Sequence, residues 1–390
     1  MERVATGWLA LEAGGGPLGV GVVFAARTLP FLLLGLPAGA LADRTERRRI
    51  LMGVALGGAL LSLVLAALVR AGAVGLWQVA AISFLMGCVQ VCDVPARQAL
   101  VVDTVGRARA ANAIALNSVA GRLFGAVGAL AGGLAIPLLG VANSYVVVAA
   151  AYLVGLTLLA FVRVAPRVHA VATRPPFRTL IAESAQLIVQ QPTVRTLVIA
   201  AMACEVFAFS FMTIVPSYAR DVLLAGPEGL GALNAATSVG ATIAVLILAA
   251  LPSQVRREPI LAMVYVVYGL ALLTLGVAGS LAIATAVVLV IGACAASFDA
   301  LQQTMIQLAV PEEQRGRAAG IWVFSIGTAP AGHLEAGALS ALLGAKPTLL
   351  INGAFVIAGG LILALRAPEY RPRRATPLAV PIAADERADR

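Results

Sequence analysis

The chain has 390 residues, of which 60% are hydrophobic and only 12% are charged, and its formal net charge is +9. A soluble domain is about 45–50% apolar and about 25% charged, so the composition excludes a protein with a single core buried in water. The basic residues are spread over many loops instead of one face, which argues against nucleic-acid binding.

Long apolar runs recur along the whole chain. A helix needs about 20 apolar residues to cross a bilayer, and runs of this order lie at about 18–42, 50–69, 75–93, 112–139, 144–163, 195–219, 229–251, 259–278, 281–303, 318–343 and 347–365. Backbone polar groups must be paired inside lipid, which leaves helices or a closed barrel. The runs lack the alternation of barrel strands. We therefore predict an all-α integral membrane protein with about eleven full spans.

The first apolar segment, Val4–Glu12, is too short to be one of these spans. At about 1.5 Å per residue it covers roughly 15 Å, half of the hydrocarbon core. The sequence Gly14-Gly15-Gly16-Pro17 ends it, and it has no pattern of a cleavable signal peptide. We expect a first helix that is truncated to half of its usual length.

The arginines fix the orientation of the spans. Arginines gather after the first, third, fifth, seventh, ninth and last runs, whereas the opposite loops hold only Arg70, Arg220 and Lys346. Positive residues are concentrated in cytoplasmic loops. We therefore place the arginine-rich side in the cytoplasm and the protein in the cytoplasmic membrane as a multi-pass protein.

The loop after the first full run carries a motif. It reads Gly39-Ala40-Leu41-Ala42-Asp43-Arg44-Thr45-Glu46-Arg47-Arg48-Arg49. This sequence resembles the signature loop of the major facilitator superfamily of transporters, Gly-x-Leu-Ala-Asp-Arg-x-Gly-Arg-Arg, with Glu46 in place of the second glycine. The resemblance implies two six-helix halves related by pseudo-two-fold symmetry.

Further segments resemble one branch of that superfamily, the enterobactin-exporter-like and macrolide-efflux-like proteins. They are Pro95–Leu100 with Asp103-Thr104-Val105, Ala111–Ser118 with Arg122–Gly125, and Val310–Arg317. The chain departs from the branch at Ala126, where many members have the proline of a Gly-Pro bend that is associated with antiport. The resemblance implies export of a small organic molecule, drug-like or siderophore-like.

The resemblance also assigns a role to the motif loop. It implies that Gly39, Asp43, Arg44, Arg47 and Arg48 form a conformational lock, in which Asp43 lies against the inner end of a helix that begins near Arg317–Gly320. A helix N-terminus attracts an anion. We expect Arg44, Arg47 and Arg48 to pair with acids of the loop, with simple topogenic charge as the alternative. Glu46 indicates a local turn that differs from the usual glycine turn.

A charged segment divides the chain into halves. Three prolines and several arginines interrupt the apolar pattern there, and apolar residues then recur at helical spacing. We predict an amphipathic helix on the inner membrane surface, or else a loosely ordered linker. The expected domains are 1–164 and 195–366 for the two transmembrane halves, 165–194 for the cytoplasmic linker, and 367–390 for a disordered tail.

Ionisable residues inside the spans are candidates for transport, because buried charge in lipid is costly. Those near mid-depth or in the outer half are Arg27, Arg122, Glu205, His333 and Glu335. A carboxyl group in the apolar surroundings of Glu205 favours its protonated form, which suits a proton carrier; a permanent Glu–Arg pair is the alternative. His333 and Glu335 are two residues apart and do not share a helix face.

Asp93 and Asp299 are secondary candidates, because they lie near the expected inner ends of their spans, where capping or loop pairing is the simpler interpretation. The sequence has no nucleotide-binding loop and no metalloprotease motif. We predict a non-enzymatic, proton-coupled exporter with no cofactor or metal, which acts as a monomer on a small-molecule substrate in the lipid bilayer. An importer or facilitator of the same fold, and a non-transporting scaffold or receptor, remain alternatives.

Overall fold

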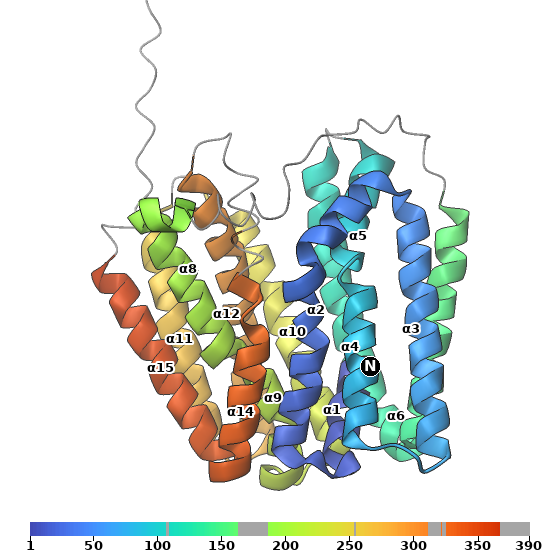
Figure 1. Cartoon of the computed structure of the whole chain (residues 1–390). Coiled ribbons are helices and arrows are strands. Elements are labelled where there is room, and N and C mark those ends of the chain that lie inside the picture. The colour runs from blue at the N-terminus through green and yellow to red at the C-terminus, as the bar shows by residue number, and fades with distance from the viewer. Residues whose placement is uncertain (107–108, 163–185, 253–254, 311–320, 322–324, 367–390) are drawn as a thin grey trace, which may run out of the picture.

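The computed structural model describes the chain except for residues 107–108, 163–185, 253–254, 311–320, 322–324 and 367–390, and it also leaves out the side chains of residues 36–37, 39–44 and 111. The expected linker helix falls mostly within these ranges, and the expected tail lies entirely within them. The described part is built of helices packed side by side with their axes roughly parallel, as Figure 1 shows.

The N-terminal half begins with a short helix. Its elements are α1 (Glu2–Ala10), a π-helical turn η1 (Leu11–Gly15), α2 (Gly16–Arg44), α3 (Arg47–Arg70), α4 (Leu76–Gln90), α5 (Asp93–Val105) and α6 (Ala110–Phe161). At about 1.5 Å per residue, the nine residues of α1 span roughly 13 Å. The N-terminus therefore lies part of the way along the bundle and not at one of its ends (Figure 1).

α6 consists of two helical arms, because the chain reverses direction at Gly140. This residue has φ +79° and ψ +162°, a conformation that glycine adopts freely and other residues avoid. The two arms correspond to the expected spans 112–139 and 144–163, joined by a sharp turn. The chain therefore crosses the membrane twice within 52 helical residues.

The C-terminal half repeats this order with one addition at its start. Its elements are α8 (Pro192–Cys204), η3 (Glu205–Phe209), α9 (Phe211–Ser217), η4 (Tyr218–Val222), α10 (Gly226–Ala250), α11 (Arg257–Val277), α12 (Leu281–Leu308), α14 (Ala329–Leu343) and α15 (Ala345–Leu365). Here α8, η3 and α9 together make the first span of this half.

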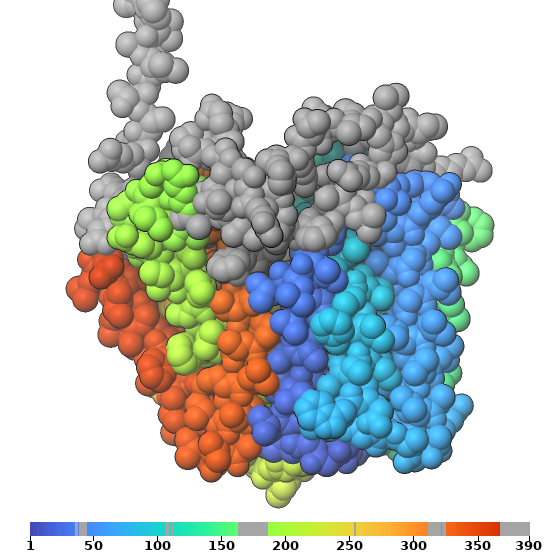
Figure 2. Space-filling view, in the orientation of Figure 1, coloured from blue at the N-terminus to red at the C-terminus, as the bar shows by residue number. Residues whose placement is uncertain are grey.

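Two crossings of small residues hold the halves together. A Cβ atom on Gly21 of α2 would lie 3.0 Å from Cα of Gly337 in α14, and one on Gly133 of α6 would lie 2.9 Å from Cα of Gly231 in α10. Helix backbones approach this closely only without side chains between them. Both crossings lie toward the end of the bundle that holds Arg70 and Gly140, which the arginine pattern places outside the cell. Figure 2 shows α14 and α2 in continuous contact there.

Candidate functional site

A central cavity of about 540 Å³ lies between the two halves. α1, α2 and α6 contribute one side of its lining, and η3, α12 and α14 contribute the other. Its size falls within the range of about 300–1,000 Å³ that small-molecule sites occupy. Of the five transport candidates identified from the sequence, the structure places Arg27, Arg122, Glu205 and His333 in this lining.

Arg27 belongs to a closed ring of polar side chains. Its guanidinium forms an ion pair with Glu2 at 2.6 Å and donates a hydrogen bond to Oε1 of Gln90 at 2.9 Å. Nε2 of Gln90 donates to the hydroxyl of Tyr152 at 3.2 Å, and that hydroxyl donates to Glu2 at 2.9 Å. Each side chain of the ring is hydrogen-bonded to its neighbours in the ring. The main role of Arg27 is therefore structural, because it joins α1, α2, α4 and α6.

Two other arginines line the cavity, and their charges are less well compensated by acidic side chains. Arg3 of α1 and Arg122 of α6 have no ion-pair partner within 4 Å among the described residues. Arg122 and Asp299 line the same cavity from opposite halves. The side of the cavity that the N-terminal half provides is therefore cationic.

The opposite side carries two carboxyl groups, Glu205 and Asp299. Glu205 is 8% exposed and begins η3, where the first span of the C-terminal half changes from α- to π-helix. Such π-helical turns occur frequently at functional sites. Asp299 lies in α12, nine residues before that helix ends at Leu308, and lines the same cavity as Glu205. The interpretation of Asp299 as a residue near the inner end of its span stays a prediction; α12 continues beyond the expected limit of residue 303 to Leu308.

His333 and Glu335 point in different directions from α14. Nδ1 of His333 lies 2.8 Å from the hydroxyl of Thr213, and its ring meets the edge of Phe24 at 5.8 Å between centroids. Glu335 instead accepts a hydrogen bond from Asn352 of α15 at 3.4 Å, inside the C-terminal half. Glu335 is absent from the lining of the central cavity.

The motif loop is described in part. α2 continues to Arg44, while the side chains of Gly39, Asp43 and Arg44, and the helix start expected at 317–320, lie outside the described residues. Glu46 precedes α3 with φ −57°, so this position needs no glycine.

The sequence interpretation expected Arg47 and Arg48 to pair with acids of their own loop; the described contacts of both arginines include partners on neighbouring helices. Arg47 forms an ion pair with Asp103 of α5, and Arg48 donates to the main-chain carbonyl of Leu159 at 2.8 Å. Because both partners lie at the cytoplasmic ends of neighbouring helices, these two arginines fasten the start of α3 to the inner end of the N-terminal half. The acid of the loop, Glu46, pairs with Arg49 at 2.7 Å.

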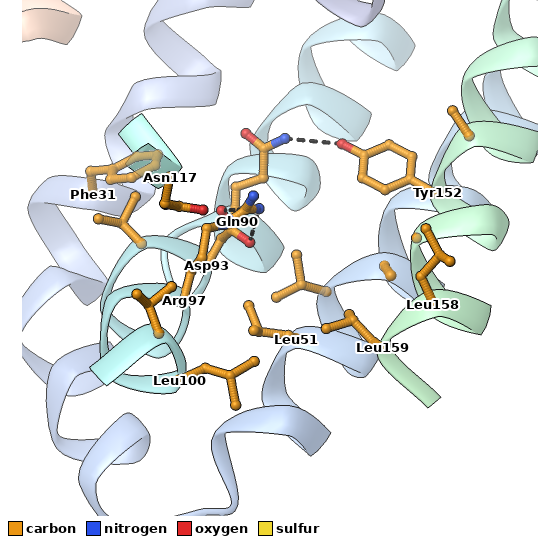
Figure 3. Close-up of a pocket in the computed structure, with 16 residues that line it drawn as sticks. Phe31, Leu51, Gln90, Asp93, Arg97, Leu100, Asn117, Tyr152, Leu158 and Leu159 are labelled. Atoms are coloured by element: carbon orange, nitrogen blue, oxygen red, sulfur yellow. Dashed lines mark hydrogen bonds and ion pairs between the residues drawn. The ribbon is translucent and has the colours of Figure 1, made fainter. Parts of the chain in front are cut away.

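A second cavity of about 600 Å³, here called the inner cavity, lies within the N-terminal half (Figure 3). It extends from Gln90 and Tyr152 toward the cytoplasmic ends of α5 and α6, and Phe31 and Gln90 line both cavities. Asp93, the first residue of α5, points into it and pairs with Arg97 at 2.6 Å. An acid in the first turn of a helix is favoured by the helix dipole, which agrees with the structural interpretation of Asp93.

The sequence alone did not indicate Glu2, Arg3, Gln90 or Tyr152 as members of the site. Glu2 and Arg3 precede the short apolar segment, and they could have been noticed as charges flanking a buried helix. Gln90 and Tyr152 are uncharged in spans of ordinary composition, so no sequence signal marked them. No group of three or more His, Cys, Asp and Glu side chains among the residues searched could hold a metal ion.

Comparison with known proteins identifies the family. The family described as transmembrane secretion effectors, a branch of the major facilitator superfamily, matches residues 1–379. The chain belongs to this family. Among curated proteins, the multidrug efflux pump Tap of Mycolicibacterium fortuitum is 26% identical over 359 residues, which cover 89% of this chain and 87% of the pump.

Comparison with solved structures shows the fold of this chain. The nucleoside transporter NupG matches with a TM-score of 0.75 and 12% identity over 93% of this chain and 96% of that one. A peptide transporter of the POT family in complex with sulfate matches with a TM-score of 0.74 and 14% identity over 95% and 92%. A bacterial homologue of the human lysosomal transporter Spinster, in an inward-facing and occupied conformation, matches with a TM-score of 0.69 and 13% identity over 96% of each chain. The protein is an all-helical membrane transporter with the major facilitator fold.

Proposed function

We propose that this transporter exports a small organic molecule by proton-coupled alternating access, with Glu205 and Asp299 as the groups that carry the proton. The proposal rests above all on the central cavity, where these two acids of the C-terminal half face the arginines of the N-terminal half. The distant efflux pump relative supports the outward direction. The motifs shared with the enterobactin-exporter-like and macrolide-efflux-like branch support a drug-like or siderophore-like substrate.

The charges of the cavity provide a physical basis for coupling. A proton on Glu205 or Asp299 removes a negative charge that faces Arg122, and this changes the attraction between the halves. A buried charge is costly in a membrane unless it is paired. Approach of the halves therefore favours the deprotonated acid, paired with the arginine, and separation of the halves removes this preference. Loading and release of a proton would thereby bias the two states of the transporter.

The outer glycine crossings suit the same cycle. We propose that they close the cavity on the side that the arginine pattern places outside the cell, as in a state that receives substrate from the cytoplasm. Rocking of one half against the other would separate Gly21 from Gly337 and Gly133 from Gly231. The crossings are contacts between helix backbones, which can part without breaking hydrogen bonds within either helix.

Transport in proteoliposomes tests the coupling. We expect purified protein to accumulate members of a panel of fluorescent organic dyes when a pH gradient is imposed. In Glu205→Gln the dye should still bind, but the pH gradient should no longer drive its accumulation, because the amide keeps the shape of the side chain and cannot carry a proton. Glu335→Gln is the matched control, since it neutralises a carboxyl group in the same half that lies outside the lining of the central cavity.

The outcomes separate the alternatives. Equal loss in both variants would assign the defect to packing and not to coupling. Undiminished accumulation by Glu205→Gln would remove Glu205 as the coupling acid. Movement of dye only down its own gradient in the parent protein would indicate a facilitator, and gradient-driven movement in the inward direction would indicate an importer.

A further inference from the structure

Gln302 of α12 is a buried amide with one unbonded end. Its side chain is 0% exposed, and its Nε2 donates a hydrogen bond to the main-chain carbonyl of Leu197 in α8. Its Oε1 is buried as well and has no hydrogen-bond partner in the described part of the chain. A buried acceptor without a donor is unfavourable, and native structures rarely leave one without a reason. The unbonded Oε1 therefore points to a donor that is present in another state of the protein.

Asp299 is the group beside Gln302 that can supply this donor. It lies three residues earlier in α12, and residues three apart on a helix are neighbours, with about 5–6 Å between their Cβ atoms. Its carboxyl group has no ion-pair partner within 4 Å among the described residues. A protonated carboxyl group carries an O–H donor, whereas an ionised one only accepts. Oε1 of Gln302 can therefore bond to Asp299 only while Asp299 holds a proton.

The packing of α8 fixes the orientation of the Gln302 amide. To donate to an ionised Asp299, the amide would have to turn Nε2 away from Leu197, and the bond between α12 and α8 would be lost. Leu197 is itself 0% exposed, and its helix is held a second time, because the Tyr265 hydroxyl of α11 donates to the main-chain carbonyl of Ala200. The acceptor end of Gln302 is therefore held in place beside the acid.

Several charged and titratable groups also surround Asp299. Those that line the central cavity with it are Glu205, His333, Arg3, Arg27 and Arg122. Those on the helices packed against α12, which are α8, α10 and α11, are Arg195, Cys204, Glu228, Arg257, Glu258, Tyr265 and Tyr268. The charges among them attract or repel an ionised Asp299 from a distance. Gln302 acts differently, because a neutral acceptor forms a bond only with the form of the acid that carries a donor.

We infer that Gln302 is a positioning residue for proton transport, whose fixed Oε1 accepts a hydrogen bond from the protonated carboxyl group of Asp299 and so favours the protonated form. This rests on the proposed function, in which Asp299 carries a proton, and adds the residue that regulates how firmly the proton is held. Loss of the proton to the central cavity leaves Oε1 without a donor, as in this structure. Without Oε1, Asp299 should lose its proton at a pH lower by about one unit, the effect of one hydrogen bond.

The chain offers variants that separate the acceptor from the packing of α8. Gln302→Met keeps the length of the side chain and cannot form either hydrogen bond, and Gln302→Leu is a second apolar replacement. Tyr265→Phe is the matched control, because it removes the other side-chain bond to the main chain of α8 and leaves Gln302 unchanged. Because Gln302 is fully buried, none of its replacements changes the access of water to a side chain at this position.

Infrared difference spectroscopy of the full chain in lipid measures the protonation of Asp299 directly. The carbonyl stretch of a protonated carboxyl group disappears when the acid ionises, and comparison with Asp299→Asn shows which part of the signal belongs to Asp299. In the parent and in Tyr265→Phe this band should disappear at the same pH. In Gln302→Met and Gln302→Leu the midpoint should be about one pH unit lower. The pH dependence of dye accumulation in proteoliposomes should move in the same direction.

Three results would overturn the inference. The midpoint could be the same in both Gln302 variants as in the parent, Tyr265→Phe could shift it equally, or Asp299 could show no band of its own at any pH. The two proposals can fail separately, because the infrared measurement does not depend on transport. A lower midpoint in the Gln302 variants, without pH-driven accumulation by the parent, would contradict the exporter. Accumulation driven by pH, with unchanged midpoints, would contradict only the role of Gln302.

Discussion

Glu2 and Arg27 show how a single residue pair can decide the stability of the N-terminal half. Their side chains are 13% and 18% exposed, and their oxygen and nitrogen atoms lie 2.6 Å apart. Removal of one partner of a buried pair leaves the other charge without compensation, which is costlier than losing the pair as a whole.

Glu2→Gln should therefore destabilise the protein by about 3–5 kcal/mol, and the double variant with Arg27→Gln should lose less than the sum of the two single changes. Arg97→Gln is the control, because its pair with Asp93 is half-exposed and such helix pairs contribute about 0.3–0.5 kcal/mol. Thermal unfolding in detergent measures the difference. Equal effects of Glu2→Gln and Arg97→Gln would contradict the structural role of the ring.

At this scale the sequence predicted some site residues and missed others for a clear reason. A charge in an apolar run is visible in the sequence, and this signal found Arg27, Arg122, Glu205 and His333. Gln90 meets Arg27 across 63 positions of sequence and Tyr152 meets Glu2 across 150, so these contacts arise only after folding. Hydropathy placed the end of the helix that carries Asp299 near residue 303, five residues before its end at Leu308.

Among the helices, α2 and α14 carry the outer seal. Their contact at Gly21 and Gly337 leaves no room for a side chain, since a Cβ atom on Gly337 would lie 2.9 Å from Cα of Gly21. The sequence shows these glycines but not their pairing, because a small residue on a membrane helix can face lipid as readily as another helix.

Gly337→Leu should hold the halves apart on the outer side and favour the outward-open state. Cysteine residues introduced into the outer part of the central cavity should then react faster with an impermeant thiol reagent added from outside. Gly53→Leu, which meets open space, should leave the labelling rate unchanged. A labelling rate in Gly337→Leu equal to that of the parent would show that the crossing does not form the seal.

For the whole molecule, the clearest predictions came from sequence features that extend along the whole chain. Run length and the asymmetry of arginines predicted helical spans and their orientation, because lipid imposes both on every segment that crosses it. The inner cavity was not foreseen, because an empty space leaves no mark in composition.

The orientation can be tested directly. Positions 70, 220 and 346 should be labelled from outside intact cells by an impermeant thiol reagent when each carries a single cysteine, in a background without Cys88, Cys92, Cys204 and Cys294. Position 256 should react only after the cells are opened. The structure is consistent with this assignment, since Arg70 bonds to Asn143 beside the Gly140 turn, at the end of the bundle opposite Arg47 and Arg48. Labelling of position 256 from outside would reverse the orientation.

The glycine crossings have one more consequence. A gate closed by an ion pair can be regulated by salt, by acid or by chemical modification of its side chains. Gly21, Gly337, Gly133 and Gly231 present main-chain atoms at the points of closest approach, and main-chain atoms offer none of these controls. What remains adjustable is volume. An added methyl group at any of the four positions should push the helices apart and shift the balance between the two states, so side-chain size is the property that tunes these crossings.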